Sequence, residues 1–565
     1  TMSLGTIPRW QWWVAALLPV LFLVPFLNKA FHIDDTVYLY VAQQIQAHPL
    51  DFFGFQMNWS YQPLWVYFFN QNPPGVSYFM AAMAFLVGWS EPGMHLIQLI
   101  PVVIASLGIF RMARHFCAQP LLATFVAVLT PSFLVSSSVI MCEPLMLACY
   151  VWAMVFWIEG LDKERWGPLA IAGVLIGLGA LTKYVVITAI PLLIAYTLVK
   201  ERRASRKLLI FLIPCGILAM YDLAGRILYE HSFLYSIFGF GLSPANRLRG
   251  ETLPVNVLTG LSYTGACYLT AFFFVPLIHG WRMGVSILAG VALVIGIVLG
   301  TDIFRSDLVD VGDAVRWGFV FQLAFFISAG VYVFALAVMD AYRNRDEKSV
   351  LLLLLISGIF VFVAIFNWTI NARALLPMAP AVGILVARQF EYRRPKFEQF
   401  HVAVPLALGA LLSLAVSYGD YVFAATARQM AQYVRADENI ELDRMWFHGH
   451  WGFQYYMEEL GARPIDWRFV AGVEVSKPGP GDAVVWWEVQ HDSLPDGLRM
   501  ASGQLVEIYD AGWVSTMNVK NGAGYYSNFM GPMPYVFGSK EPEKFWIFRV
   551  AEDPYVSLEV IPQAR

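Results

Sequence analysis

The sequence predicts a polytopic α-helical membrane protein with a C-terminal extracytoplasmic α/β domain. Hydrophobic residues make up 58% of the 565-residue chain, charged residues only 14%, and the mean hydropathy is +0.56. A soluble chain carries about 25% charged residues and could not bury this much apolar surface in a core. Apolar runs of membrane-spanning length recur as far as residue 418, and beyond it the sequence resembles that of a soluble domain.

About thirteen apolar runs approach or reach the roughly 17–25 residues that a transmembrane helix needs. They lie at about 11–30, 94–111, 120–136, 144–159, 168–182, 184–200, 208–225, 255–279, 284–300, 317–340, 349–367, 375–390 and 399–418. The first run lacks a small-residue cleavage site, so we expect a retained span. The shorter run Val76–Trp89 suits a helix that lies on the membrane surface.

The cations set the expected orientation. If Val76–Trp89 does not cross, one set of loops collects the clusters 111–114, 163–165, 202–207, 343–348 and 393–396. By the positive-inside rule these loops, and with them the N-terminus, face the cytoplasm. An odd number of spans then places everything from Gly419 onward outside.

Two domains follow from this organisation. Residues 1–418 form the membrane domain, with long outer loops at 31–93 and 226–254, and residues 419–565 form the outer soluble domain. In the soluble domain we expect an amphipathic helix at Tyr421–Arg435 and strands at Ala483–Val489, Leu505–Tyr509 and Phe545–Val550. The net charge of −3 provides no basic field for nucleic acid. Because most of the chain is apolar, membrane lipids are its expected surroundings.

The strongest chemical feature is a pair of carboxylates directly after the first span. Asp34 and Asp35 stand in His32-Ile33-Asp34-Asp35-Thr36-Val37-Tyr38. Carboxylates at a membrane boundary are costly unless they serve a function, and two adjacent side chains diverge. One can therefore face a cleft while its neighbour holds structure. The alternative is a solvated helix cap at the start of Thr36–Gln46.

Further candidates lie on the same predicted side of the membrane. A rigid turn, Gln71-Asn72-Pro73-Pro74-Gly75, precedes the surface helix, and the lone charges Glu143, Lys183 and Arg373 stand at the outer ends of spans. Lys183 and Arg373 could bind a lipid-linked phosphate, or else only extend to the interface. The second outer loop adds His231, Arg247 and Arg249.

These motifs together resemble those of a known family. Asp34-Asp35-x-x-Tyr38 resembles the Asp-Glu-x-x-Tyr signature of the protein O-mannosyltransferase superfamily, which includes bacterial aminoarabinose transferases acting on lipid A. Asn72-Pro73-Pro74 is similar to the family's Lys-Pro-Pro, Leu181-Thr182-Lys183 to its Leu-Thr-Lys-Gly, and Arg373–Pro377 to its Arg-Tyr-x-x-Pro. The segment Trp451-Gly452-Phe453-Gln454-Tyr455-Tyr456 resembles one in the soluble domain of bacterial members.

The resemblance implies a GT-C fold; aminoarabinose transferases have thirteen spans and an outer C-terminal domain. Three positions depart from the family pattern: Asn72 replaces the phosphate-binding Lys, Tyr184 replaces Gly, and Ala374 replaces Tyr. These departures affect the positions expected to meet the donor headgroup and the acceptor.

The resemblance also implies a reaction. A sugar would pass from a polyprenyl-phosphate donor of undecaprenyl type to a lipid, glycan or protein acceptor, with inversion, at the periplasmic face of a bacterial inner membrane. Asp34 would be the general base, and Asp35 and Tyr38 would orient it or the sugar. The leaving phosphate would be met by Lys183, Arg373 and one of Arg247 and Arg249, and Glu143 would bind sugar hydroxyls or pair with a cation.

Cofactor use stays open at this stage. A divalent metal could be held by Asp34, Asp35, Glu143, His32 and His231, but phosphate-leaving members of the family generally need none. His448-Gly449-His450 favours a strand over a metal site. Two other functions fit part of the pattern: a flippase of lipid-linked sugars, which needs no base, and a non-catalytic scaffold for envelope assembly.

Overall fold

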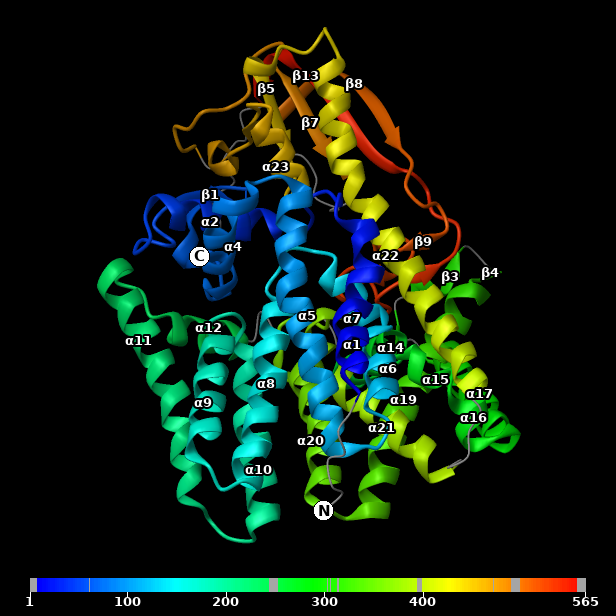
Figure 1. Cartoon of the computed structure of the whole chain (residues 1–565). Coiled ribbons are helices and arrows are strands. Elements are labelled where there is room, and N and C mark those ends of the chain that lie inside the picture. Colours follow the sequence, from blue (N-terminus) through cyan, green and yellow to red (C-terminus); the bar gives the residue numbers. More distant parts are fainter. Residues whose placement is uncertain are drawn as a thin grey trace, which may run out of the picture. The chain divides into compact units, whose positions relative to one another are not determined.

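The computed structural model describes residues 8–555 apart from 60, 243–251, 302, 305, 312–313, 394–398, 471 and 489–497 (Figure 1). It divides into two compact units. The helical unit comprises Thr1–Asn28, Gln71–Asp420 and Trp513–Gly538. The sheet unit comprises Lys29–Asn70, Tyr421–Gly512 and Ser539–Arg565. Each unit is therefore assembled from three separate pieces of the chain.

The helical unit is built from long apolar helices joined by short breaks. Its helices are α1 (Arg9–Leu23), η1 (Val24–Phe26), α4 (Gly75–Val87), α5 (Glu91–Phe116), α6 (Pro120–Val128), α7 (Pro131–Ser137), α8 (Glu143–Asp162), α9 (Trp166–Ala180), η2 (Tyr184–Thr188), α10 (Ala189–Glu201), η3 (Arg206–Phe211), α11 (Leu212–Tyr229), α12 (Phe233–Leu242), α14 (Leu253–Cys267), α15 (Leu269–Phe272), α16 (Val275–His279), α17 (Trp281–Gly300), α18 (Ser306–Val309), α19 (Trp317–Asn344), α20 (Glu347–Val361), η4 (Phe362–Phe366), η5 (Arg373–Met378), α21 (Ala379–Arg393) and the first part of α22 (Gln399–Ala436). Its strands are β3 (Asp310–Val311), β4 (Ala314–Val315), β9 (Val514–Ser515), β10 (Met517–Asn518), β11 (Ala523–Gly524) and β12 (Val536–Phe537).

Nine helices in the described part of the chain are long and apolar enough to cross a membrane, or up to eleven if each of two bent pairs is one span. The nine correspond to nine of the predicted spans, so the polytopic helical fold class is confirmed. Two other predicted spans, 120–136 and 255–279, are the bent pairs, with bends of 64° and 72°. The span at 168–182 is the 15-residue α9, and the one at 375–390 combines η5 with α21. A total of thirteen stays a prediction.

Proline accounts for the first bend. Pro131 begins α7 and has no N–H to continue the helix from α6, and the Thr130 hydroxyl accepts the Phe133 N–H at 3.3 Å. The run at Val76–Trp89 is the 13-residue α4, shorter than a span. Its place on the outer membrane surface stays a prediction.

The sheet unit is an α/β fold, as expected. It contains α2 (Asp35–Ala47), β1 (Gln56–Asn58), β2 (Pro63–Trp65), α3 (Val66–Phe69), the last part of α22, η6 (Leu442–Arg444), β5 (Met445–His448), α23 (Trp451–Glu459), β6 (Arg463–Pro464), η7 (Trp467–Phe469), β7 (Ala483–Trp487), β8 (Leu498–Ile508) and β13 (Glu543–Tyr555). The main sheet has the order β6-β5-β7-β13-β8; β5 runs parallel to β6 and β7, and β13 runs antiparallel to β7 and β8 (Figure 1).

The C-terminal elements lie where the sequence predicts them. The three expected strands are β7, β8 and β13, although β8 and β13 extend further than their apolar runs. The expected helix Tyr421–Arg435 is the last part of the 38-residue α22, continuous with the apolar run 399–418. One side of the sheet packs on a core of Trp446, Ile465, Val484 and Val550.

The compact units differ from the linear division at residue 418. The outer loop segment Lys29–Asn70 groups with the C-terminal sheet, and Trp513–Gly538 groups with the helices. Specific bonds fix the second segment: the Tyr535 hydroxyl donates to the Ala266 carbonyl at 2.8 Å, and the Ala372 N–H donates to the Tyr525 carbonyl at 2.9 Å. Hydropathy carries no information about such pairings.

Candidate functional site

Three charged side chains predicted to bind phosphate or sugar meet in the helical unit. Glu143 is fully buried, and its Oε1 lies 2.5 Å from Lys183 Nζ and 3.7 Å from Arg373 Nη1. We refer to these three residues as the Glu143 cluster. They come from three separate parts of the chain, so the fold alone brings them together.

Each member stands at a break in regular structure. Glu143 is the first residue of α8, and the irregular segment before it is held by Gln98, whose Nε2 donates to the Met141 carbonyl at 2.6 Å. Lys183 lies between α9 and η2 and has an extended backbone conformation. Arg373 opens η5, where the Asn371 side chain accepts the Ala374 N–H at 2.8 Å. Helix ends at such breaks aim side chains inward while leaving backbone groups to be capped.

Arg373 is further enclosed by groups that the sequence analysis did not select. Its guanidinium carbon lies 5.1 Å from the centroid of the Tyr526 ring, and Nη1 lies 2.5 Å from the Met141 sulfur. The Tyr526 hydroxyl donates to Asp420 Oδ2 at 2.6 Å, and Thr516 donates to Asp420 Oδ1 at 2.9 Å. The adjacent aromatic pair at 525–526 was the only sequence signal for this part of the site.

The Glu143 cluster carries one carboxylate and two cations, a formal net charge of +1. The side chains of Lys183 and Arg373 are only 20% and 10% exposed. Glu143 Oε2 has no hydrogen-bond partner among the residues that the structure describes. Lys183 and Arg373 can each donate to an oxygen of an anion, and an unpaired carboxylate oxygen can accept a hydroxyl. The arrangement is therefore suited to an anionic ligand that also carries hydroxyl groups.

The turn containing Asn72 lies against the loop of Lys183. The Gly75 N–H donates to the Leu181 carbonyl at 2.8 Å. A Cβ at Gly75 would lie 2.6 Å from that carbonyl oxygen, so only glycine permits the approach. Thus the segments that resemble Lys-Pro-Pro and Leu-Thr-Lys-Gly are neighbours in the fold.

In the sheet unit, the two adjacent aspartates have different surroundings. Asp35 is buried and its Oδ2 accepts the His32 N–H at 2.8 Å. Asp34 is half-buried at the N-cap of α2, and its side chain makes no capping hydrogen bond. The preceding Ile33 has φ +47°, a strained value for a β-branched residue. Tyr38 is buried one turn further on.

The Trp451–Tyr456 segment packs on this same loop. Thr36 Oγ1 donates to the Trp451 carbonyl at 2.8 Å, and the Phe31 N–H donates to the Tyr456 hydroxyl at 2.8 Å. The ring centroids of Phe31 and Tyr455 are 4.8 Å apart. Two motifs more than 400 residues apart in sequence therefore form one structure around the carboxylates.

Of the remaining candidates, the structure describes His231. His231 follows α11, where burial lowers the pKa of its imidazole and its ring lies 5.7 Å from that of Phe233. Arg247 and Arg249 lie outside the described residues. Within the described ranges, no three or more His, Cys, Asp or Glu side chains are grouped so as to hold a metal ion.

His448 is the last residue of strand β5, in agreement with the strand that the sequence favours here. Burial, with the nearby His450 second, lowers the pKa of His448 to about 3, and burial lowers that of His450 to about 4. Both rings are therefore neutral at physiological pH.

Several solved structures are similar to this chain. The oligosaccharyltransferase of Archaeoglobus fulgidus, in complex with Zn and sulfate, is 15% identical, with 84% of this chain and 68% of that chain covered and a TM-score of 0.49. ArnT from Cupriavidus metallidurans bound to undecaprenyl phosphate is 14% identical, with 86% and 94% covered and a TM-score of 0.37. Arabinofuranosyltransferase AftD from mycobacteria is 11% identical, with 98% and 42% covered and a TM-score of 0.38.

No curated protein matches the sequence. A family comparison does match: residues 71–228 fit the family described as dolichyl-phosphate-mannose-protein mannosyltransferase. The matched segment contains the Asn72 turn, Glu143 and Lys183. This match confirms the recognition made from the motifs, and residues 71–228 are similar to that family of mannosyltransferases.

Proposed function

We propose that the protein transfers a sugar from a polyprenyl-phosphate carrier to an acceptor hydroxyl. The observation that carries this proposal is the Glu143 cluster, a buried site with two cations, of which Glu143 and Lys183 lie in the family-matched segment. The family's own name specifies a polyprenyl-type phosphate donor, and a phosphate is the anion that such a site would balance.

The cluster would bind the carrier phosphate. Arg373 presents a planar fork and Lys183 a compact ammonium, the two groups that bind phosphate oxygens with charge-assisted hydrogen bonds. Glu143 holds Lys183 in place, and its Oε2 is available to accept a sugar hydroxyl. As the bond to the sugar breaks, charge grows on the phosphate, and the two fixed cations stabilise it.

Asp34 would be the general base. The acceptor oxygen forms a bond to the anomeric carbon, the bond from that carbon to the phosphate oxygen breaks with its electron pair, and Asp34 takes the acceptor's proton. Attack opposite the leaving phosphate inverts the anomeric centre. A correctly placed base contributes about 10²–10⁴-fold to such a step. The partial exposure of Asp34, beside a buried and bonded Asp35, supports this division of roles.

We place the reaction at the outer face of a bacterial inner membrane, with the N-terminus in the cytoplasm. The cation distribution in the sequence supports this orientation. Lipid, glycan and protein are the candidate classes of acceptor.

The test is a donor panel. Purified full-length protein in lipid nanodiscs is incubated with polyprenyl-phosphate sugars and an acceptor extract, and released carrier phosphate and glycosylated product are measured. We expect stoichiometric release of both with at least one donor, and much less of both from Lys183→Ala protein. Movement of the lipid across a vesicle membrane without consumption would instead identify a flippase.

A further inference from the structure

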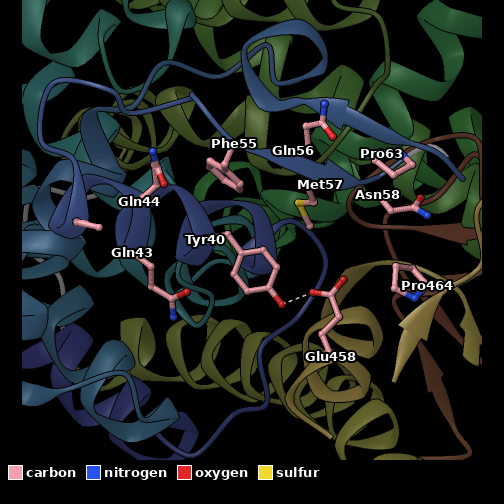
Figure 2. Close-up of a pocket in the computed structure, with 11 residues that line it drawn as sticks. Tyr40, Gln43, Gln44, Phe55, Gln56, Met57, Asn58, Pro63, Glu458 and Pro464 are labelled. Carbon is pink, nitrogen blue, oxygen red and sulfur yellow. Dashed lines mark hydrogen bonds between the residues drawn. The ribbon is translucent and has the colours of Figure 1, made fainter. Parts of the chain in front are cut away.

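A cleft of about 560 Å³ lies within the sheet unit (Figure 2). Its volume falls in the range of about 300–1,000 Å³ typical of small-molecule sites. Three elements line it: helix α2, the hairpin of β1 and β2, and helix α23 with the following β6. Neither the family match, which ends before this unit's C-terminal elements, nor the proposed transfer chemistry assigns it a role.

The sequence builds the cleft on one face of α2. Tyr40, Gln43, Gln44 and Ala47 have the spacing i, i+3, i+4, i+7, which places their side chains along a single stripe of a helix. Opposite them, β1 pairs antiparallel with β2. Asn58 at the end of β1 is buried and its Nδ2 donates to the Ile465 carbonyl at 3.1 Å, which ties the hairpin to the segment after α23.

One carboxylate is fixed at the cleft wall. The Tyr40 hydroxyl donates to Glu458 Oε2 (Figure 2). Gln454 Nε2 donates to Glu458 Oε1 at 2.8 Å. Burial raises the pKa of Glu458 above its ordinary value. The carboxylate is thus held in one orientation by two donors and keeps lone pairs for another hydroxyl.

Side-chain amides supply most of the other polar groups. The side chains of Gln43 and Gln56 make no hydrogen bond within the described part of the chain, although both line the cleft. Gln44 donates from Nε2 to the Asp51 carbonyl at 2.9 Å, so its amide oxygen can accept. Each free amide offers paired donors and acceptors at the end of one planar group.

The charge and chemistry of the lining select the ligand. Apart from Tyr40, Glu458 is the one ionisable residue among those that line the cleft, and no Lys, Arg or His is present in that set. A phosphate or carboxylate ligand would find no counter-charge. Sugar hydroxyls, by contrast, both donate and accept, which matches amides and a carboxylate, and their apolar ring faces suit the aromatic rings of Tyr40 and Phe55.

We propose that this cleft binds a neutral sugar residue of a glycan acceptor. Its role as an acceptor subsite rests on the proposed function; the binding itself does not. The same helix α2 carries Asp34 at its N-cap, six residues before Tyr40, a rise of about 9 Å along the axis. A short glycan held in the cleft can therefore extend toward the base.

The experiment measures sugar binding to the full-length protein in nanodiscs. The probes are neutral oligosaccharides of several hexoses and pentoses, the matching sugar phosphates, and an uncharged peptide of similar size, followed by saturation-transfer NMR and titration. We expect the neutral oligosaccharides to bind best. The double variant Gln43→Ala/Gln56→Ala should weaken that binding about tenfold or more, because two side-chain hydrogen bonds are lost.

The matched control is Tyr433→Phe, which removes a sheet-unit tyrosine hydroxyl bonded to Gln504 and outside the cleft lining. Its sugar affinity should equal that of the wild type. Equal melting temperatures for all three proteins confirm that folding is unaffected. The inference is overturned if no neutral sugar binds, if sugar phosphates or the peptide bind better, or if the double variant binds as well as the wild type.

The outcome is separable from that of the proposed function. Lys183→Ala should weaken donor-lipid binding and keep sugar binding, whereas Gln43→Ala/Gln56→Ala should weaken sugar binding and keep donor-lipid binding. Sugar binding without any transfer by the wild type would contradict the proposed function and leave the cleft assignment standing.

Discussion

At the scale of single residues, Asp34 and Asp35 illustrate how neighbours in sequence acquire different roles. Asp35 is buried and fixes the loop through the His32 N–H, while Asp34 stays half-buried at the start of α2. A base must reach solvent or substrate to exchange its proton, whereas a structural carboxylate must not. The surroundings therefore favour Asp34 for chemistry.

We predict that Asp34→Asn abolishes transfer and that Asp35→Asn impairs it less. Asparagine is nearly isosteric with aspartate and can still accept a hydrogen bond, but it has no basicity. Turnover of released carrier phosphate is the measurement, with donor-lipid binding as the control that should survive in Asp34→Asn. If Asp34→Asn turns over normally and Asp35→Asn is inactive, the general base is Asp35 and not Asp34.

Lys183 has a structural partner as well as a proposed ligand. Because Lys183 neutralises the fully buried Glu143, its removal affects both donor binding and the stability of the cluster. We predict that Lys183→Ala weakens donor binding by about 1.5–3 kcal/mol, the value of a charge-assisted hydrogen bond.

A double-variant comparison separates the two effects. Lys183→Ala/Glu143→Gln removes the unpaired buried charge, so its melting temperature should return toward that of the wild type while donor binding stays weak. Donor titration measures the donor affinity and thermal unfolding measures the melting temperature, both in the same detergent. Unchanged donor affinity in Lys183→Ala would reduce Lys183 to a structural partner of Glu143.

Some residues of the Glu143 cluster and its surroundings could be selected from the sequence, and others could not. Lone charges at the ends of apolar runs are conspicuous, which is why Glu143, Lys183 and Arg373 could be selected. Tyr526 could not be selected with them, because no sequence pattern shows that the segment 513–538 returns to the helices and places Tyr526 beside Arg373 and Asp420.

At the scale of elements, the contact between α23 and the loop before α2 is unusually close. A Cβ on Gly452 would lie 1.8 Å from the Phe31 carbonyl oxygen. The backbone of the motif therefore touches the backbone of the Asp loop, and the glycine at this position is required by space rather than by a special dihedral angle.

We predict that Gly452→Ala destabilises the sheet unit by about 1–3 kcal/mol or more, the usual cost of overpacking. Differential scanning fluorimetry in detergent should show a clearly lower transition, together with lower transfer activity. Gly479→Ala is the control, since a Cβ there meets nothing nearer than 3.7 Å and should leave the transition unchanged. If Gly452→Ala and Gly479→Ala unfold at the same temperature, the loop before α2 can move enough to accommodate the added methyl group.

Element boundaries were predictable where composition changes and not where it continues. The break at Pro131 was hidden inside one apolar run, so 120–136 reads as a straight span although two helices form it. Conversely, 399–418 and Tyr421–Arg435 read as separate elements because polarity changes at Asp420, while the helical hydrogen bonds of α22 continue across it.

At the scale of the whole molecule, orientation is the property on which the proposed mechanism depends. The cation clusters predict that residues from Gly419 onward are outside, and Asp34 shares that side. We predict that a C-terminal alkaline phosphatase fusion is active, because the enzyme matures only outside the cytoplasm. An inactive fusion beside a working cytoplasmic reporter would place both the sheet unit and Asp34 on the wrong side for the proposed acceptor.

The order of the main sheet has a consequence for how the protein is made. Strand β13 pairs with both β7 and β8, and α2, near the other end of the chain, rests on α23 of the same unit. The loop before α2 therefore stays unassembled, with its carboxylates and aromatic residues, until the ribosome has delivered more than 400 further residues. Such long-range closure is slow and leaves apolar surface exposed, so we expect lipid or a chaperone to cover that loop during synthesis. With Asp34 as the proposed base, a nascent chain that stops before Tyr456 is inactive.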